Sequence, residues 1–255
     1  MEENVTVKDF FIFTAPRSGS TVLTRTLDKH PQIFCAGELF HPSENIYHPE
    51  WHFPFTGKKK KKGFSRKIFA VTNYIKGYFS GVDHIKKFYS KRNNKEIRGF
   101  KLMIGHIKDF PTVWKYLRTN NFKIVVLIRN NTFREALSSF RARKIGVFHS
   151  TEELELAQKK VIINAALLKK RVDELEAIKS NILNISVNAN RIVIMYEDFK
   201  NWQQMLDKVF DFLGADKIEI EPELRKTSTA NWRDGVENYQ EVEEMLKEKY
   251  AHYLD

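Results

Sequence analysis

The sequence has few of the features that would tie a chain to an oxidising compartment, a membrane or a zinc site. Its 255 residues include one cysteine, Cys35, so no disulfide can form within the chain. This cysteine usage favours a reducing compartment. No apolar run approaches the roughly 18 residues of a transmembrane helix, and residues 1–5 lack the basic start of a secretory signal. With no cysteine pairs, we expect no bound metal and a cytoplasmic protein.

The composition is that of a folded basic domain. Hydrophobic residues make up 42% of the chain and aromatic residues 13%, which is enough for a buried core. We expect a single domain over residues 1–255. The formal net charge is +11, and the run Lys58–Lys62 contributes five of these charges. A net positive charge suits binding to nucleic acid, anionic lipid or a small polyanion. A lysine-rich loop that is simply solvated explains the run Lys58–Lys62 equally well.

Residues 10–21 consist of an apolar run, a small polar turn and the start of a helical pattern. This arrangement directs backbone N–H groups and a helix dipole at an anion. The turn resembles the phosphate-binding P-loop, G-x-x-x-x-G-K-[ST]. Aligned on Gly19, it has Thr14 in place of the first glycine and Ser20 in place of the lysine. Arg17 offers a cation from inside the loop. We therefore expect a phosphate loop without metal–triphosphate chemistry.

Strand and helix patterns alternate along the chain. The expected strands are residues 10–15, 33–36, 97–104, 123–128 and 191–195, and the expected helices are 20–29, 66–90, 110–119, 151–184, 201–213 and 239–253. Thr132 is expected to cap the helix after the fourth strand, and Ser150 with Glu153 to form a capping box. The expected fold class is α/β: a P-loop-like doubly wound parallel sheet flanked by helices, with a helical insertion.

Residues 41–95 are the expected insertion between core strands. They contain an irregular aromatic loop, the lysine run and a stripe of apolar residues with interleaved lysines over residues 66–90. Such a stripe could lie on an anionic membrane surface. Aromatic residues at helical spacing more often pack on the domain's own core, and we favour that interpretation. The insertion is expected to shape the acceptor site.

Three side chains are expected near the phosphate loop, because ligands collect at the carboxyl ends of parallel strands. Arg129 directly follows the strand of residues 123–128, and Ser138 lies about two turns into the next helix. Glu38 follows the strand of residues 33–36. On position alone, Glu38 is interpreted as a capping or surface carboxylate.

In their order, these features resemble the sulfotransferases that use 3′-phosphoadenosine 5′-phosphosulfate (PAPS). Residues 15–21 resemble that family's loop for the 5′-phosphosulfate, and Arg129 with Ser138 resembles its site for the 3′-phosphate. The segment Tyr196–Phe199, followed by Phe212-Leu-Gly, is similar to the family's Y-E-D-L…F-L-G pattern. A finer resemblance, to the branch of bacterial trehalose 2-sulfotransferase and related carbohydrate sulfotransferases, rests on residues 17–21, 35–38, 99–103 and 236–239.

The resemblance implies transfer of a sulfuryl group from PAPS to a hydroxyl of a carbohydrate or glycolipid-like acceptor, by in-line displacement and without a metal. It implies that Arg17 stabilises the leaving phosphate. The remaining loop residues would bind the 5′-phosphate through backbone N–H groups and hydroxyls: Ser18, Gly19, Ser20 and Thr21. Arg129 and Ser138 would bind the 3′-phosphate. The resemblance makes Glu38 the general base, against the positional interpretation above.

Several assignments stay open at this stage. His41 and His106 are alternatives to Glu38 as the base. The family's R-K-G cofactor segment is missing, and Lys226 or the pair Trp232-Arg233 could replace it. Lys101, near a strand end, could face either the cofactor or the surface.

Two other functions compete with this reading. A small-molecule kinase would carry the P-loop lysine, where this chain has Ser20. A nucleic-acid or membrane-surface binder would depend on Lys58–Lys62. The expected partner is a small-molecule or glycan acceptor, without nucleic acid and with peripheral contact to an anionic membrane as an option. The oligomeric state is not specified by the sequence.

Overall fold

A computed structural model describes residues 8–42, 47–56, 64–91, 94–146, 159–223 and 231–254, with side chains from residue 67 onward in the helix that begins at residue 64. The lysine run Lys58–Lys62, the residue Lys226 and the expected capping box of Ser150 and Glu153 lie outside these ranges.

The described chain alternates strands and helices in the expected order. The strands are β1 (Phe10–Thr14), β2 (Ile33–Ala36), β3 (Ile97–Met103), β4 (Lys123–Ile128) and β5 (Arg191–Met195). The α-helices are α1 (Ser20–Lys29), α2 (Phe64–Ser90), α3 (Ile104–Asp109), α4 (Pro111–Thr119), α5 (Thr132–Ile145), α7 (Ala165–Ile185), α8 (Trp202–Leu213) and α9 (Tyr239–Tyr250). Short 3-10 helices are η1 (Pro49–Trp51), η2 (Tyr196–Asn201), η3 (Trp232–Gly235) and η4 (Ala251–Tyr253).

The five strands form one parallel sheet in the order β2-β3-β1-β4-β5. β1 lies at the centre, pairing with β3 on one side and β4 on the other. Since all strands run the same way, the loops after β1, β2 and β4 emerge at one edge. The expected fold class, a doubly wound parallel sheet flanked by helices, is confirmed.

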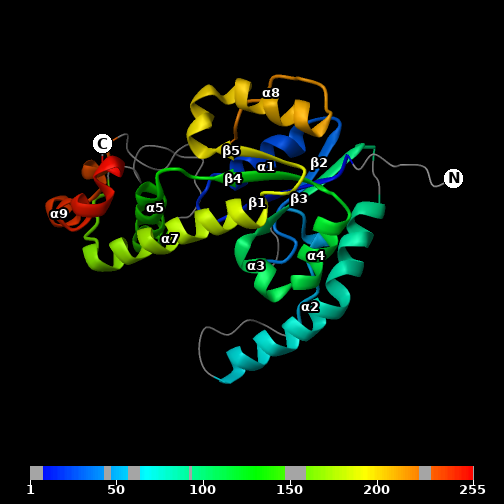
Figure 1. The fold of residues 1–255 in the computed structure, drawn as a ribbon, viewed down its shortest axis with the longest axis horizontal. Helices are drawn as coiled ribbons and strands as arrows, with labels where there is room; N and C mark the ends of the chain where they lie inside the picture. The colour runs from blue at the N-terminus through cyan, green and yellow to red at the C-terminus, as the bar shows by residue number, and fades with distance from the viewer. Residues whose placement is uncertain are drawn as a thin grey trace.

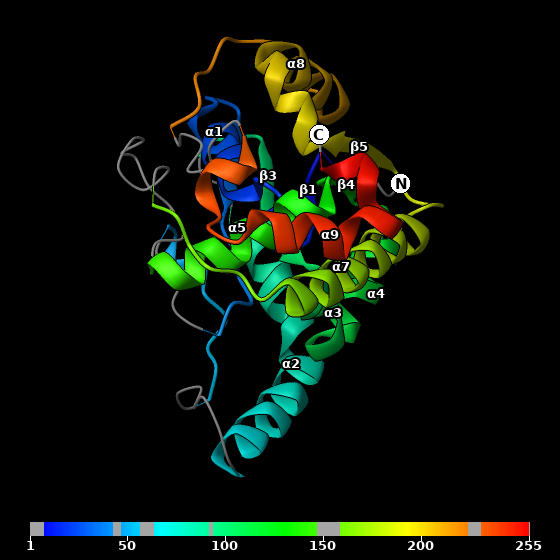
Figure 2. The same cartoon turned by 90° about the vertical axis from the view of Figure 1, so that its left-hand side faces the viewer.

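The central strand is apolar on both faces, as expected for a strand covered by helices on each side. Phe10 and Ile12 pack with α1 and α8, and Phe11 and Phe13 pack with α2, α4 and α7. Figures 1 and 2 show these two helical layers on opposite sides of the sheet. A further apolar cluster joins α5, α7 and α9 beside the sheet.

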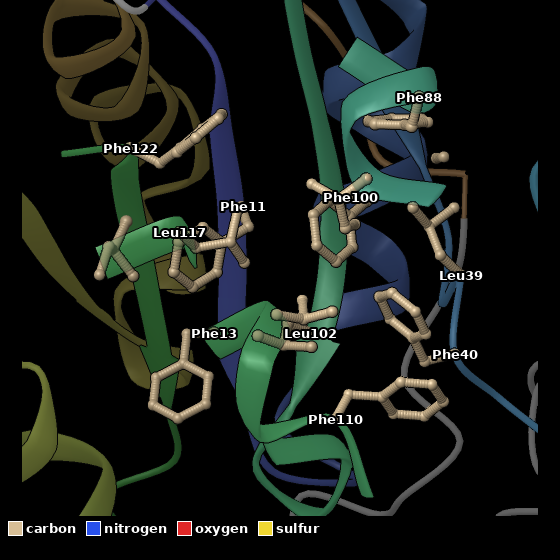
Figure 3. Packing of buried hydrophobic residues seen from close by; sticks show 14 of the residues in the cluster. Phe11, Phe13, Leu39, Phe40, Phe88, Phe100, Leu102, Phe110, Leu117 and Phe122 are labelled. Carbon is tan, nitrogen blue, oxygen red and sulfur yellow. The ribbon is translucent and has the colours of Figure 1, made fainter. Parts of the chain in front are cut away.

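The layer of α2 and α4 is built largely from phenylalanine rings, as Figure 3 shows. Phe11 stacks on Phe100 of β3 with ring centroids 6.2 Å apart. Phe110, between α3 and α4, lies 4.3 Å from Phe40, which follows β2 by only four residues. Edge-to-face and offset contacts of this kind stabilise aromatic cores beyond the area they bury. The ring cluster therefore ties α2 and α4 to the segment that carries Glu38.

Two local predictions are wrong. Asn131, not Thr132, caps α5, because its side-chain oxygen accepts a hydrogen bond from the backbone N–H of Arg134 at 2.8 Å. The helix expected over residues 151–184 is not present at residues 159–164, and α7 begins at Ala165, while residues 151–158 lie outside the described ranges. Before α7, Val161 forms a parallel bridge with Val236. The run Val161-Ile-Ile is β-branched, and an available pairing partner favours its extended form over a helix.

The stripe on α2 also departs from the favoured interpretation. Its C-terminal half packs on the core through Ile85 and Phe88. Its N-terminal half, from Ile68 to Phe79, exposes most of its apolar side chains to solvent. Among the described residues, no helix has the length and apolar character needed to cross a bilayer.

Candidate functional site

The loop after β1 has the backbone geometry of an anion cradle. Arg17 and Gly19 both adopt positive φ angles, 66° and 86°. Glycine is required at position 19, since a Cβ there would lie 2.6 Å from the ring of Tyr196. Because α1 has Gly19 as its N-cap, no capping side chain competes for the N–H groups of its first turn. These N–H groups and the helix dipole suit a phosphate oxygen.

Hydroxyl groups fasten this loop to the sheet. Thr14 donates a hydrogen bond to the carbonyl of Leu127 on β4 at 2.7 Å. The Ser18 hydroxyl therefore donates to Thr14 Oγ1, at 2.5 Å. Thr14, which stands where a P-loop has glycine, thus holds the loop to two strands. Since the Ser18 hydroxyl is engaged inside the protein, its backbone N–H is the group left for an anion.

The structure brings Arg17 and Ser138 together across the carboxyl edge of the sheet. The guanidinium of Arg17 donates to Ser138 Oγ from Nη2 at 3.0 Å and from Nε at 3.3 Å. The Ser138 hydroxyl, as acceptor in these bonds, keeps its own proton for donation to a ligand. Burial lowers the pKa of Arg17, and the nearby Arg129 lowers it further. The two sequence-predicted phosphate subsites are therefore in direct contact.

Arg129 is a half-buried cation with unused hydrogen-bonding capacity. Its Nε is buried and has no hydrogen-bond partner among the described residues. Its guanidinium lies over the ring of Tyr196, 4.4 Å from the centroid. Burial lowers the pKa of Arg129. A buried N–H without a partner costs free energy, and an anionic oxygen would remove that cost. The residues present thus fit a phosphate at this position.

The segment after β5 contacts both Arg129 and the loop that carries Arg17. Tyr196 contacts Gly19 and Arg129, as described above. The Glu197 carboxylate accepts hydrogen bonds from the backbone N–H groups of Asn130 at 3.0 Å and Asn131 at 3.1 Å. It thereby fixes the turn between β4 and α5. The sequence shows this segment as a family pattern but indicates no role for Tyr196 or Glu197, because the residues that they contact are distant in sequence.

Glu38 lies at the same edge, after β2, in a charged cluster. Its Oε1 is 2.9 Å from Lys101 Nζ, and its Oε2 is 3.7 Å from His106 Nε2. Lys101 also donates to Thr21 Oγ1 at 3.4 Å. Lys101, whose direction the sequence left open, is therefore buried between Glu38 and the first turn of α1. It connects the expected acceptor side of the site to the phosphate loop.

Electrostatics keep Glu38 ionised. Burial raises the pKa of its carboxyl, but the Lys101 ammonium, His106 and His41 together outweigh burial and leave the pKa below its ordinary value. The backbone N–H of Met103 donates to His106 Nδ1 at 3.4 Å, so a neutral His106 carries its proton on Nε2, toward Glu38. Of the two histidines considered as alternatives, His106 lies within 4 Å of Glu38.

The residues suggested to replace the R-K-G segment have contacts within the protein. Trp232 is buried, stacks edge-on against Phe133 and donates to the carbonyl of Leu254 at 3.0 Å. Arg233 pairs with Glu243.

No group of three or more His, Cys, Asp or Glu side chains in the described part of the chain is placed to hold a metal ion.

Comparison with known proteins decides the family. A family model described as the sulfotransferase family matches residues 9–219. The chain belongs to the sulfotransferase family. It is similar in fold to a sulfotransferase from Alicyclobacillus acidocaldarius, with a TM-score of 0.52, 16% identity and coverage of 96% of this chain and 91% of that one.

Two further solved structures resemble the chain less closely. Mouse sulfotransferase SULT7A1 complexed with PAP gives a TM-score of 0.43 at 17% identity, over 83% of this chain and 59% of that one. The sulfotransferase domain of the Synechococcus PCC 7002 olefin synthase gives 0.45 at 18%, over 95% and 86%. Among curated proteins, no sequence matches the chain significantly.

One buried acid in this sulfotransferase was not expected from the sequence. Glu135 of α5 is 3% exposed, and its Oε1 has no hydrogen-bond partner among the described residues. Burial raises its pKa from 4.5 to about 7, against the opposing effect of Arg129. In the sequence it looks like an ordinary first-turn acid of a helix. The structure instead places it close enough to Arg129 to raise the pKa of that guanidinium, against the effect of burial.

Replacing Glu135 with Gln should change how stability depends on pH. The folded protein binds the Glu135 proton more tightly than the unfolded chain does. The proton therefore adds to the free energy of unfolding, and this contribution is complete below the pKa that Glu135 has in the unfolded chain. It is lost as pH rises through about 7. Between about pH 4 and pH 8, the unfolding free energy of the wild type should fall by about 3 kcal/mol relative to Glu135→Gln.

Urea unfolding at a series of pH values measures this difference. The exposed acid Glu174 on α7 supplies the control, since Glu174→Gln should follow the wild-type curve. Parallel curves for wild type and Glu135→Gln would show that folding does not raise the pKa of Glu135.

Proposed function

We propose that this sulfotransferase moves the sulfuryl group of PAPS to a hydroxyl of a carbohydrate or glycolipid-like acceptor. The observation that carries the proposal is the buried, unused Nε of Arg129, beside the linked pair Arg17 and Ser138. These groups suit a ligand with two separate phosphates. Membership of the family supports PAPS as the donor. When bound, PAPS supplies an activated sulfuryl group on its 5′-phosphate.

The phosphate loop is the proposed site of the 5′-phosphate. The backbone N–H groups of Ser18, Gly19, Ser20 and Thr21 would bind its oxygens, together with the hydroxyls of Ser20 and Thr21. Arg17 would stabilise the negative charge that grows on the leaving phosphate oxygen. Its contact with Ser138 would hold the guanidinium at the boundary of the two proposed phosphate subsites. Arg129 and Ser138 would bind the 3′-phosphate.

Glu38 is the proposed general base. Its ionised carboxylate would accept the proton of the acceptor hydroxyl as the oxygen attacks. A lowered pKa keeps the carboxylate available at neutral pH, although it also weakens the base. Lys101 holds one carboxylate oxygen in place, and the other faces His106. The charge pair therefore orients the base beside the phosphate loop.

The acceptor class rests on sequence resemblance. Residues 17–21, 35–38 and 99–103 resemble the carbohydrate branch, and in the structure they form the phosphate loop, the Glu38 segment and the strand of Lys101. The fourth segment, residues 236–239, has a structural role instead. Asn238 accepts from the backbone N–H of Ile163 at 2.9 Å and donates to its carbonyl at 2.7 Å. Only the first three segments thus support the acceptor proposal.

Binding of nucleotides tests the donor site. Arg129→Gln should weaken the binding of adenosine 3′,5′-bisphosphate by about 10- to 100-fold, because a charge-assisted contact is lost. Adenosine 5′-phosphate, which lacks the 3′-phosphate, should bind both proteins similarly. Calorimetry with the two nucleotides measures the contrast, and the exposed Arg143→Gln on α5 is the matched control. Equal losses for both nucleotides, or no binding of the bisphosphate by wild type, would count against the proposal.

Turnover tests the base. Glu38→Gln should lower turnover by at least about 100-fold and leave bisphosphate affinity unchanged, because the amide cannot take the hydroxyl proton. Transfer from labelled PAPS to a panel of sugar, glycolipid and phenol acceptors provides the assay. Glu50→Gln, at an exposed carboxylate of η1, should keep full activity. Near-normal turnover of Glu38→Gln would remove Glu38 as the base.

A further inference from the structure

The N-terminal half of α2 carries an apolar face that the protein leaves open to solvent. Its members are each 43% to 75% exposed: Ile68, Val71, Tyr74, Ile75, Tyr78 and Phe79. Their spacing places them on one side of the helix, along about 17 Å of its axis. Figures 1 and 2 both show this end of α2 projecting away from the rest of the protein. A surface helix normally exposes polar residues here, and a continuous apolar patch marks an interaction site.

The opposite face of α2 is firmly attached, so the exposed face is held in a fixed position. Gly77 and Gly81 allow close packing: a Cβ at Gly77 would lie 2.5 Å from the ring of Phe110, and one at Gly81 would lie 2.9 Å from Val113. The buried Asn73 accepts from the backbone N–H of Thr56 at 2.7 Å. Phe110 in turn packs on Phe40, close in sequence to Glu38. The exposed face therefore stands on the same structural unit as the proposed base.

The charge around this face has one sign. The described side chains of this half of α2, residues 67–82, include Lys67 and Lys76 and no Asp or Glu. Lys67 is exposed beside Ile68, whereas the Lys76 ammonium donates a hydrogen bond to the carbonyl of Pro54. The run Lys58–Lys62 lies outside the described residues and is not part of the surface considered. An apolar face with an exposed lysine at its edge and no acid on this stretch of helix suits an anionic partner.

We infer that the exposed face of α2 docks on an anionic membrane surface. Aliphatic and aromatic side chains would enter the headgroup region, where Tyr74, Tyr78 and Phe79 have the amphipathic or apolar character found at such interfaces. The exposed Lys67 would meet the negative surface potential. A second copy of the chain fits less well, because a twofold dimer would place this face against itself and bring like charges together.

The inference is independent of the proposed chemistry. Membrane docking does not require Arg17, Arg129 or Glu38, and sulfuryl transfer does not require the exposed face of α2. Docking would bring the protein to hydroxyl groups presented at a lipid surface. A vesicle-binding measurement without PAPS therefore tests docking by itself.

The experiment compares binding of the full chain to vesicles of phosphatidylcholine alone and of phosphatidylcholine with phosphatidylglycerol, by cosedimentation. The test variant is Ile68→Ser, Ile75→Ser and Phe79→Ser together. The control is Ile162→Ser, Leu167→Ser and Val187→Ser, three apolar residues of similar exposure, 56% to 61%, elsewhere on the protein. All the substituted side chains are exposed, so both variants should fold.

Wild type and control should bind the anionic vesicles, and the test variant should bind them at least about tenfold more weakly. Binding to the neutral vesicles should be weak for all three proteins, and added salt should weaken the anionic binding. The inference is wrong if wild type binds neither vesicle or if the test variant binds as the control does. Sedimentation velocity without lipid adds one further outcome: self-association that the test variant abolishes would assign the face to a second copy instead.

Discussion

The proximity of two guanidinium groups, Arg17 and Arg129, is the constraint on which the site depends. Both are partly withdrawn from water, and burial lowers the pKa of each. Arg129 lowers the pKa of Arg17 further, because like charges destabilise each other where water screens poorly. Folding has to hold these cations together against that cost. The aromatic face of Tyr196 and the Ser138 hydroxyl offset part of it, and a ligand with two phosphates would offset the rest.

The second pair of charged side chains in the site has opposite charges, which attract each other. Glu38 and Lys101 neutralise each other at 2.9 Å in a largely buried position. Such a pair adds little net stability, because desolvation of both ions offsets their attraction. Its value lies in geometry, since Lys101 reaches both the carboxylate and Thr21 at the start of α1. One residue on β3 thus links Glu38 to the loop after β1, and the sheet register determines its place.

Much of this arrangement could be predicted from the sequence. β4, with its unbroken β-branched run, has the expected bounds, and the loop before α1 has the expected geometry. The direction of the Lys101 side chain could not be predicted, because a shift of one residue in strand register moves a side chain to the opposite face of the sheet. The role of Tyr196 depends on segments far apart in the chain. Glu135 reads as a common helix-start acid, and only tertiary packing shows that it is buried.

A crystal structure of the protein with adenosine 3′,5′-bisphosphate tests the two-phosphate site most directly. The expected result is a 5′-phosphate held by the backbone of residues 17–21 and a 3′-phosphate bonded to Arg129 and Ser138. In that complex Arg129 Nε would gain the partner that it lacks among the described residues. A nucleotide bound elsewhere, or one whose 3′-phosphate makes no contact with Arg129, would contradict the account.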